Sequence, residues 1–256
     1  MQRRLKHIEA RVLPRGWADV LRQLSLFLGA YLLYQVVRGM VDGNDVAQAT
    51  WNAYKVISLE QTLHIFIEPS IQHWTLHMQW LMDIADSTYL NAHYVLTIGA
   101  LVWIYLKRND SFYFVRNMFM VAMAVALVGY ALYPTAPPRL MPQWGFTDSI
   151  QQFTGITVEH GPSSALLNLY AAIPSMHVCF ALMIGWPMAR LVRNRAAAVA
   201  WALYPVLITF VVIATGNHYL TDVVLGAITA LASALLSKQL LARARPDVWA
   251  FGQAPA

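Results

Sequence analysis

Long apolar runs separated by short charged segments dominate the hydropathy pattern of this chain. A membrane-spanning helix needs roughly 20 predominantly apolar residues, and several runs reach that length. Six spans are predicted, at about 22–40, 88–106, 114–133, 175–191, 196–214 and 218–237. The pattern therefore predicts an all-α, polytopic membrane protein, with no internal repeat.

The segment between the first two runs has a different character. Its apolar positions recur at near-helical spacing, but it carries too many charges for a span: Lys55, Glu60, Glu68, Asp83 and Asp86. We expect amphipathic helices lying at the membrane interface here. His73 and His77 stand one helical turn apart, but no third ligand accompanies them, so they are interpreted as surface histidines.

These features divide the chain into four parts. Residues 1–22 form a basic tail, and residues 23–87 hold the first span and the interfacial helices. Residues 88–241 form a five-helix region interrupted by a Pro- and Gly-containing loop at 134–173, and residues 242–256 form a second tail.

Composition and charge placement agree with a membrane protein of defined orientation. Only 12% of residues are charged, against about 25% in soluble domains. Of the 18 Lys and Arg residues, all but Arg38, Lys55 and Arg139 fall on one side of the predicted spans. By the positive-inside rule that side is cytoplasmic. The net charge of +5 is explained by this placement, and no nucleic-acid partner is expected.

Two histidines open two of the apolar runs. His177 and His218 are 41 residues apart, which is the length of two spans and a turn, so both are predicted at the same, extracytoplasmic face. Asp222 follows His218 by four residues and shares its helix face. Two histidines, a carboxylate and two helix N-termini at one depth indicate a site that handles phosphate.

The residue types suggest roles at such a site. Asp222 would accept the proton of one imidazole nitrogen of His218 and leave the other free to attack. His177 would act as general acid toward a leaving alkoxide. The alternative for each is a polar residue that only ties helices together.

Further candidates for substrate binding lie nearby. Arg139 follows three prolines in Pro134–Arg139, and a guanidinium on a stiff segment suits bidentate phosphate binding. Ser175 is a candidate N-cap whose neighbouring amides could hold phosphate oxygens, and His93 lies in the second span. The alternatives are an interfacial arginine, a simple cap and a buried hydrogen-bonding histidine. The loop holds only two acids, Asp148 and Glu159, so we expect chemistry without a metal or another cofactor.

These motifs resemble those of the type 2 phosphatidic acid phosphatase superfamily. Pro174-Ser175-Met176-His177 is similar to its Pro-Ser-Gly-His motif, and His218 with Asp222 matches its His-x-x-x-Asp. The resemblance covers about 88–240 and implies the six-helix core of that superfamily.

Two motif elements of the superfamily are missing. Its Lys-x6-Arg-Pro motif is absent, and Val211-Val212 stands where Ser-Arg is expected. The segment Pro134–Arg139, together with Gly216-Asn217-His218-Tyr219, is similar instead to the inositol phosphorylceramide synthase-like branch. That resemblance implies that Arg139 takes over part of the phosphate clamp and makes Asn217 a further candidate for substrate contact.

The branch resemblance implies a multi-pass enzyme of the plasma membrane that moves a phosphoalcohol head group from a phospholipid to an alcohol such as inositol or a lipid alcohol. His218 would form a phosphohistidine, His177 would protonate the leaving oxygen, and Asp222 would stabilise the imidazolium. Three alternatives stay open: a phosphatase that hydrolyses phosphatidic acid-type or polyprenyl phosphates, a non-catalytic lipid-binding or transport protein, and a di-metal membrane enzyme.

Overall fold

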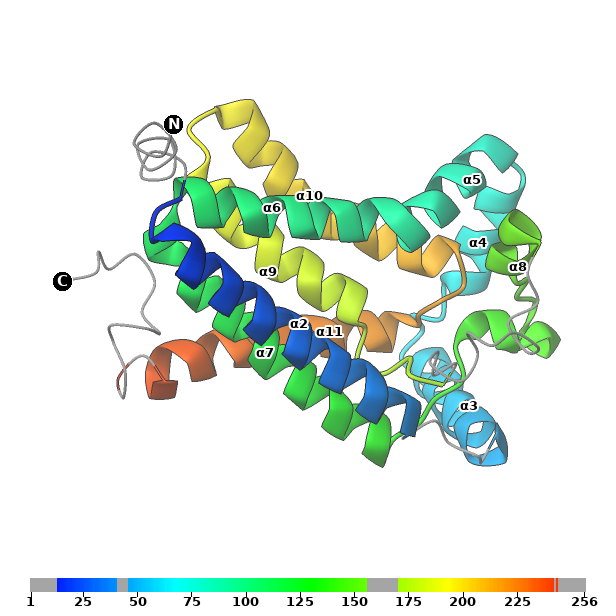
Figure 1. The fold of residues 1–256 in the computed structure, drawn as a ribbon. Helices are drawn as coiled ribbons and strands as arrows, with labels where there is room; N and C mark the ends of the chain where they lie inside the picture. The colour runs from blue at the N-terminus through cyan, green and yellow to red at the C-terminus, as the bar shows by residue number, and fades with distance from the viewer. Residues whose placement is uncertain (1–12, 41–45, 156–169, 242, 244–256) are drawn as a thin grey trace.

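The computed structural model describes residues 13–40, 46–155, 170–241 and 243. Every regular element in those ranges is helical, and the only extended pairing among them is a single bridge between Thr135 and Ala171 (Figure 1). The described chain is therefore all-α, as predicted.

Long apolar helices run side by side as a bundle. The helices of the bundle are α2 (Gly16–Met40), α6 (His93–Lys107), α7 (Asn109–Leu132), α9 (Met176–Leu191), α10 (Arg195–Ala214) and α11 (Leu220–Leu236). Among the described residues, five segments are long and apolar enough to cross a membrane: Gly16–Val37, Gln79–Lys107, Asn109–Leu132, Arg195–Ala214 and Leu220–Gln239. The remaining predicted span, at about 175–191, corresponds to α9, an apolar helix of only 16 residues.

Helix α9 occupies the centre of the bundle, where it contacts α6, α7, α10 and α11. Helix α9 packs closely against α10. A Cβ on Gly185 would lie 2.7 Å from the carbonyl oxygen of Trp201 in α10, so only glycine permits this approach. The helix that carries His177 is therefore held from several sides.

The second span begins earlier than the sequence pattern predicted. Helix α5 (Gln79–Ser87) continues through a π-helical turn, η1 (Thr88–Ala92), directly into α6. The prediction excluded 79–87 because of Asp83 and Asp86. However, Asp86 is buried and accepts a hydrogen bond of 2.8 Å from Ser149 of α8 (Ser149–Thr154), so a partner from the loop makes its burial tolerable.

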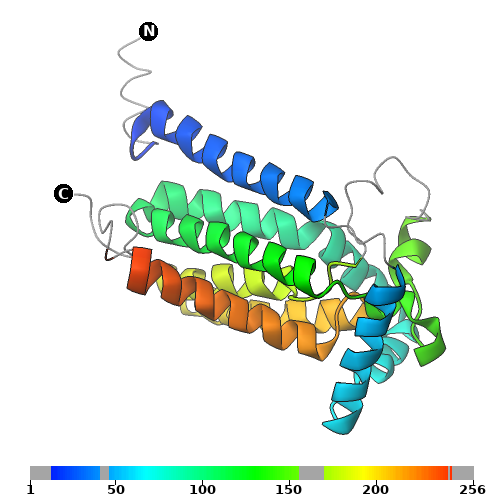
Figure 2. The same ribbon diagram turned by 90° about the horizontal axis from the view of Figure 1, so that it is seen from below.

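One end of the bundle is covered by α3 (Val46–Thr62), α4 (Glu68–Leu76) and the segment after α7, which forms α8 and the turns η2 (Pro138–Leu140) and η3 (Pro142–Trp144) (Figure 1). Figure 2 shows α3 crossing this end at a steep angle to the spans. A small apolar core joins α3, the segment after α7 and the turn before α11, and includes Ile57, Met141, Phe146 and Tyr219. The predicted loop at 134–173 is thus partly helical, although 156–169 lie outside the described residues.

The opposite end of the bundle collects the basic connections. Helix α2 begins there, and η6 (Ser237–Leu241), which continues α11, ends there (Figure 1). Lys107 and Arg108 join α6 to α7, and Arg193 joins α9 to α10 at the same end. Of the predicted tails, residues 1–12, 242 and 244–256 lie outside the described residues, and α2 takes up the end of the first tail from Gly16.

Candidate active site

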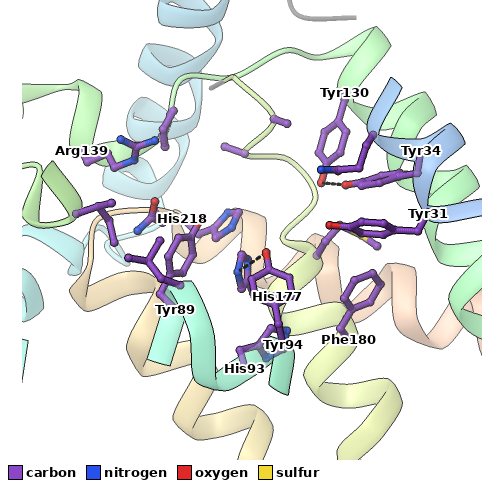
Figure 3. Close-up of a pocket in the computed structure, with 18 residues that line it drawn as sticks. Tyr31, Tyr34, Tyr89, His93, Tyr94, Tyr130, Arg139, His177, Phe180 and His218 are labelled. Carbon is purple, nitrogen blue, oxygen red and sulfur yellow. Dashed lines mark hydrogen bonds between the residues drawn. The ribbon is translucent and has the colours of Figure 1, made fainter. Parts of the chain in front are cut away.

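A cavity of about 410 Å³ opens at the end of the bundle that α3 and α8 cover. Its walls come from α2, η1, α6, α7, α9, the segment after α7 and the turn before α11. Figure 3 shows His177 and His218 near its centre, Arg139 on one side, and Tyr31, Tyr34 and Tyr130 on the other. Residues far apart in sequence therefore meet around one space.

His218 and Asp222 form a buried pair on this wall. The Nδ1 atom of His218 lies 3.2 Å from Oδ2 of Asp222, which also accepts the Tyr219 amide at 2.9 Å. Because a carboxylate acceptor favours the tautomer with hydrogen on Nδ1, the lone pair of His218 belongs to Nε2. His218 lines the cavity, so the arrangement suits a nucleophilic imidazole.

A tight turn presents His218 to the cavity. Gly216 has a positive φ of 66°, and a Cβ there would lie 2.6 Å from the side-chain nitrogen of Gln72. Asn217 lines the cavity, and its side-chain amide donates to the hydroxyl of Thr215 at 2.8 Å. The turn is thus fixed by a conformation that favours glycine and by its own side chains.

His177 starts α9 and faces His218. Their ring centres are 6.0 Å apart, and the ring of Tyr89 stacks on His177 at 4.2 Å. The hydroxyl of Tyr94 lies 3.3 Å from Nε2 of His177. The two imidazoles are close enough to act on opposite sides of one small group, with the plane of His177 set by two tyrosines.

Backbone contacts set the separation of these histidines. The Ser175 amide donates to the carbonyl oxygen of Asp222 at 3.1 Å. Where α11 passes this turn it carries Gly226, and a Cβ there would lie only 2.4 Å from the carbonyl oxygen of Ser175. The absence of that side chain allows the start of α9 to approach α11.

Arg139 enters the cavity from the segment after α7. Its Nη1 atom forms a 2.9 Å ion pair with Asp148, and its backbone amide donates to the Gly216 carbonyl at 2.7 Å. Its Nε is buried without a hydrogen-bond partner. The guanidinium is therefore oriented by Asp148, and one of its donors has no partner among the described residues.

The remaining candidates are placed differently. The Nδ1 atom of His93 lies 2.8 Å from the Tyr204 hydroxyl, and the His93 ring centre is 5.1 Å from that of His177. The Nε2 atom of His93, which also lines the cavity, is buried without a hydrogen-bond partner. Ser175 is fully buried, and its hydroxyl accepts the Val178 amide at 3.5 Å as the N-cap of α9.

The first amides of α11 are not available for phosphate, in contrast to the expectation from two helix N-termini. The amide of Tyr219 donates to Asp222, that of Leu220 to Glu68, and that of Thr221 to Glu60. Protein carboxylates therefore already occupy the place that an anion would take at this helix start.

Sequence reasoning missed the tyrosines of the cavity. Tyr89 and His93 are four residues apart at the start of the predicted second span, so their shared helix face was a usable signal. The three tyrosines on the opposite wall come from α2 and α7, and no spacing in the sequence connects these two helices.

Within the described residues, no group of three or more His, Cys, Asp and Glu side chains is arranged to hold a metal ion. The ring centres of His73 and His77 are 4.4 Å apart, and Nδ1 of His77 lies 2.7 Å from the His73 carbonyl oxygen. Both side chains are exposed on α4 or at its end.

Comparison with known proteins places this chain in a family. No curated protein and no solved structure matches the chain. The family model of the PAP2 superfamily matches residues 54–236, which is more than half of the 256-residue chain and includes both histidines. Members of this superfamily are typically phosphatases or phosphotransferases. The match supports a lipid-directed function of that general kind, and the chain belongs to the PAP2 superfamily, the type 2 phosphatidic acid phosphatases.

Proposed function

We propose that the protein is a metal-independent lipid phosphotransferase that moves a phosphoalcohol head group from a phospholipid to an alcohol through a phosphohistidine on His218. The observation that carries this proposal is the buried pair of His218 and Asp222 facing His177 across 6.0 Å in a cavity lined by Arg139. Nucleophile, general acid and anion-binding group are thus gathered around one space.

The first half-reaction forms the intermediate. The Nε2 lone pair of His218 attacks phosphorus, and the bond from phosphorus to the lipid oxygen breaks. Protonated His177 transfers its proton to that oxygen, which leaves as a lipid alcohol. Asp222 accepts the Nδ1 hydrogen of His218 and stabilises the positive imidazolium, while Arg139 balances the charge of the phosphoryl oxygens.

The second half-reaction reverses these roles. His177, now neutral, takes the proton of an acceptor alcohol, and the alcohol oxygen attacks phosphorus. The bond between phosphorus and Nε2 breaks, which returns both histidines to their starting states. If water is the acceptor instead, the same steps release a phosphate ester or free phosphate, and the protein is a phosphatase.

An apolar groove supports a lipid as the donor. A second cavity of about 740 Å³ lies between α2, α6, α7 and α9, and it shares Tyr31, Tyr94 and Phe180 with the first. Along α6 it extends from Tyr94 to Leu106, which is about 18 Å at the rise of a helix. One leaflet of the hydrocarbon core is about 15 Å thick, so the groove can hold a hydrocarbon tail while the phosphate sits at the histidines.

The wall opposite His218 supports an alcohol as acceptor. Tyr31, Tyr34, Tyr130 and the amide of Gln35 line it. The Tyr34 hydroxyl donates to that of Tyr130 at 3.4 Å, and Tyr130 donates to the Pro174 carbonyl oxygen at 3.3 Å. Hydroxyl and amide groups of this kind can bind the hydroxyls of a polyol such as inositol.

The charge distribution supports an active site on the outer side of the plasma membrane. The basic connections lie at the end of the bundle opposite α3 and α8 (Figure 1). The cavity is lined from the other end, by residues such as Arg139 and Ile150. Since cytoplasmic loops carry the excess of Lys and Arg, we assign the cavity to the extracytoplasmic side.

The test incubates purified protein with labelled phospholipids, with and without inositol or a lipid alcohol, in the presence of EDTA. A new labelled phosphodiester is expected, which is a phospholipid when the acceptor is a lipid alcohol and a water-soluble diester when the acceptor is inositol. It should be formed by the wild type and by His73→Ala, whose side chain is exposed and does not line the cavity. His218→Ala is expected to lose turnover. Free phosphate or a free phosphate ester as sole product indicates the phosphatase. Binding of lipid without any turnover indicates a lipid-binding protein, and loss of turnover in EDTA indicates a metal enzyme.

A further inference from the structure

Two glutamates are buried completely beside the start of α11. Glu60 lies near the end of α3 and Glu68 is the first residue of α4, and both side chains have 0% exposure. None of the ion pairs in the described part of the chain involves either residue. A buried carboxylate without a cation is costly, so this pair needs an explanation.

Both carboxyl groups hold the first turn of α11. Oε1 of Glu60 accepts the amide and the hydroxyl of Thr221, each at 2.7 Å. Oε1 of Glu68 accepts the Leu220 amide at 2.7 Å. Together with Asp222, which accepts the Tyr219 amide, they satisfy three consecutive amides that a helix start leaves without internal partners.

The second oxygen of each carboxyl group bears on the protonation state of the pair. Oε2 of Glu60 and Oε2 of Glu68 are both buried, and neither has a donor. Their Oε1 atoms accept the amides of the consecutive residues Leu220 and Thr221, so the two carboxyl groups are close neighbours. Two ionised carboxylates have only acceptors to offer each other, whereas one protonated carboxyl group donates to its neighbour.

We propose that Glu60 and Glu68 share one proton and that this acid pair is a positioning device, which fixes the start of α11 and through it His218 and Asp222. His218 and Tyr219 directly precede the amides that the pair binds, and Asp222 directly follows them. The catalytic part of this inference rests on the proposed function, while the shared proton does not.

The surroundings favour a single negative charge on the pair. Among the described residues, the titratable groups that interact with the pair are Tyr219 and Asp222. Burial raises the pKa of Tyr219, so its hydroxyl stays neutral, and Asp222 repels a charge on Glu60. Burial, together with the neighbouring Glu60 carboxyl group, raises the pKa of Glu68 from its ordinary 4.5 to about 8.

This shift has a defined consequence for stability. Between pH 4.5 and about 8 the unfolded chain releases the proton of Glu68 while the folded protein keeps it, so the folded state binds more protons and loses stability as pH rises. Above about pH 8 the pair carries two like charges, and its hold on the first turn of α11 weakens.

The experiment compares the wild type with Glu68→Gln, whose amide hydrogen replaces the shared proton and whose oxygen can still accept the Leu220 amide. The thermal midpoint of the wild type is expected to fall from pH 5 to 9 more steeply than that of the variant. Turnover of Glu68→Gln at pH 7 is expected to stay within about threefold of the wild-type value. Above pH 8 the turnover of the wild type should decline, whereas that of Glu68→Gln should not. Glu68→Ala removes the acceptor of the Leu220 amide, and its turnover is expected to fall roughly tenfold or more.

Asp83→Asn removes a carboxylate on α5 that contacts Gln79 instead of α11, so it should keep the wild-type pH profile. An infrared difference spectrum at pH 7 should show a protonated carboxyl band in the wild type that Glu68→Gln lacks. Absence of that band in the wild type, or equal alkaline declines in the wild type and Glu68→Gln, would overturn the proposal. If no lipid is turned over, the proposed function fails while the spectrum and the stability profile still decide on the shared proton.

Discussion

Gly226 offers a sharp test of whether the spacing between α9 and α11 governs the chemistry. An alanine Cβ at this position would lie 2.4 Å from the carbonyl oxygen of Ser175, about 1.0 Å short of the 3.4 Å at which ordinary contact begins. The contacted atom belongs to backbone, which cannot turn aside as a flexible side chain can. The Gly226→Ala variant must therefore push the turn before His177 away from the helix that carries Asp222.

Two opposing effects determine the stability of the Gly226→Ala variant. Forcing an extra methyl group into a packed contact costs about 1–3 kcal/mol, while replacing glycine by alanine inside a helix gains about 1 kcal/mol. The net loss of stability is therefore about 0–2 kcal/mol. The effect on turnover is larger, because a misplacement of about 1 Å costs about 100-fold in rate.

The assay measures kcat for lipid head-group transfer or hydrolysis together with the thermal midpoint in detergent. Gly99→Ala is the matched control, since it makes the same change in a spanning helix where a Cβ would meet no atom within 4 Å. We expect Gly226→Ala to stay folded and lose about 100-fold in kcat, and Gly99→Ala to remain active. Wild-type turnover in Gly226→Ala would refute the claim that this contact sets the distance between the histidines.

Two further predictions concern the nucleophile and the lipid groove. Asp222→Asn should lower kcat by roughly 1000-fold with little change in KM, because an amide that donates to Nδ1 favours the wrong tautomer of His218; a preserved kcat would contradict the assigned role. Val102→Trp, inside the groove, should lower kcat/KM for a long-chain donor but not for a short-chain one. Val95→Trp changes a side chain that is 69% exposed and outside the groove, so a similar loss in both variants would argue against tail binding there.

The α3–α4 region shows where reasoning from sequence stopped. The charges at 55–86 predicted interfacial helices, and α3 and α4 are helices outside the five long apolar segments. Because of the same charges, the prediction left 79–87 out of the second span. The hydrogen-bond partner that makes burial of Asp86 tolerable is Ser149, 63 residues away, so the local sequence could not identify it. The local sequence pattern did not indicate that Glu60 and Glu68 bind the start of α11, because each contact joins residues more than 150 positions apart.

The sequence by itself determined the class of the protein and most of the candidate residues. In lipid, an apolar run of membrane-spanning length satisfies its backbone hydrogen bonds by forming a helix. The length and pitch of such helices then place His177, His218 and Asp222 at one face of the membrane. Only the tertiary structure decided which side chains complete the site. Separate helices and turns pack together to form the tyrosine wall, the ion pair that orients Arg139, and the acid pair at the start of α11. This packing depends on close contacts such as those at Gly185 and Gly226. The partners in such contacts are far apart in the sequence, so periodicity along the chain cannot identify them.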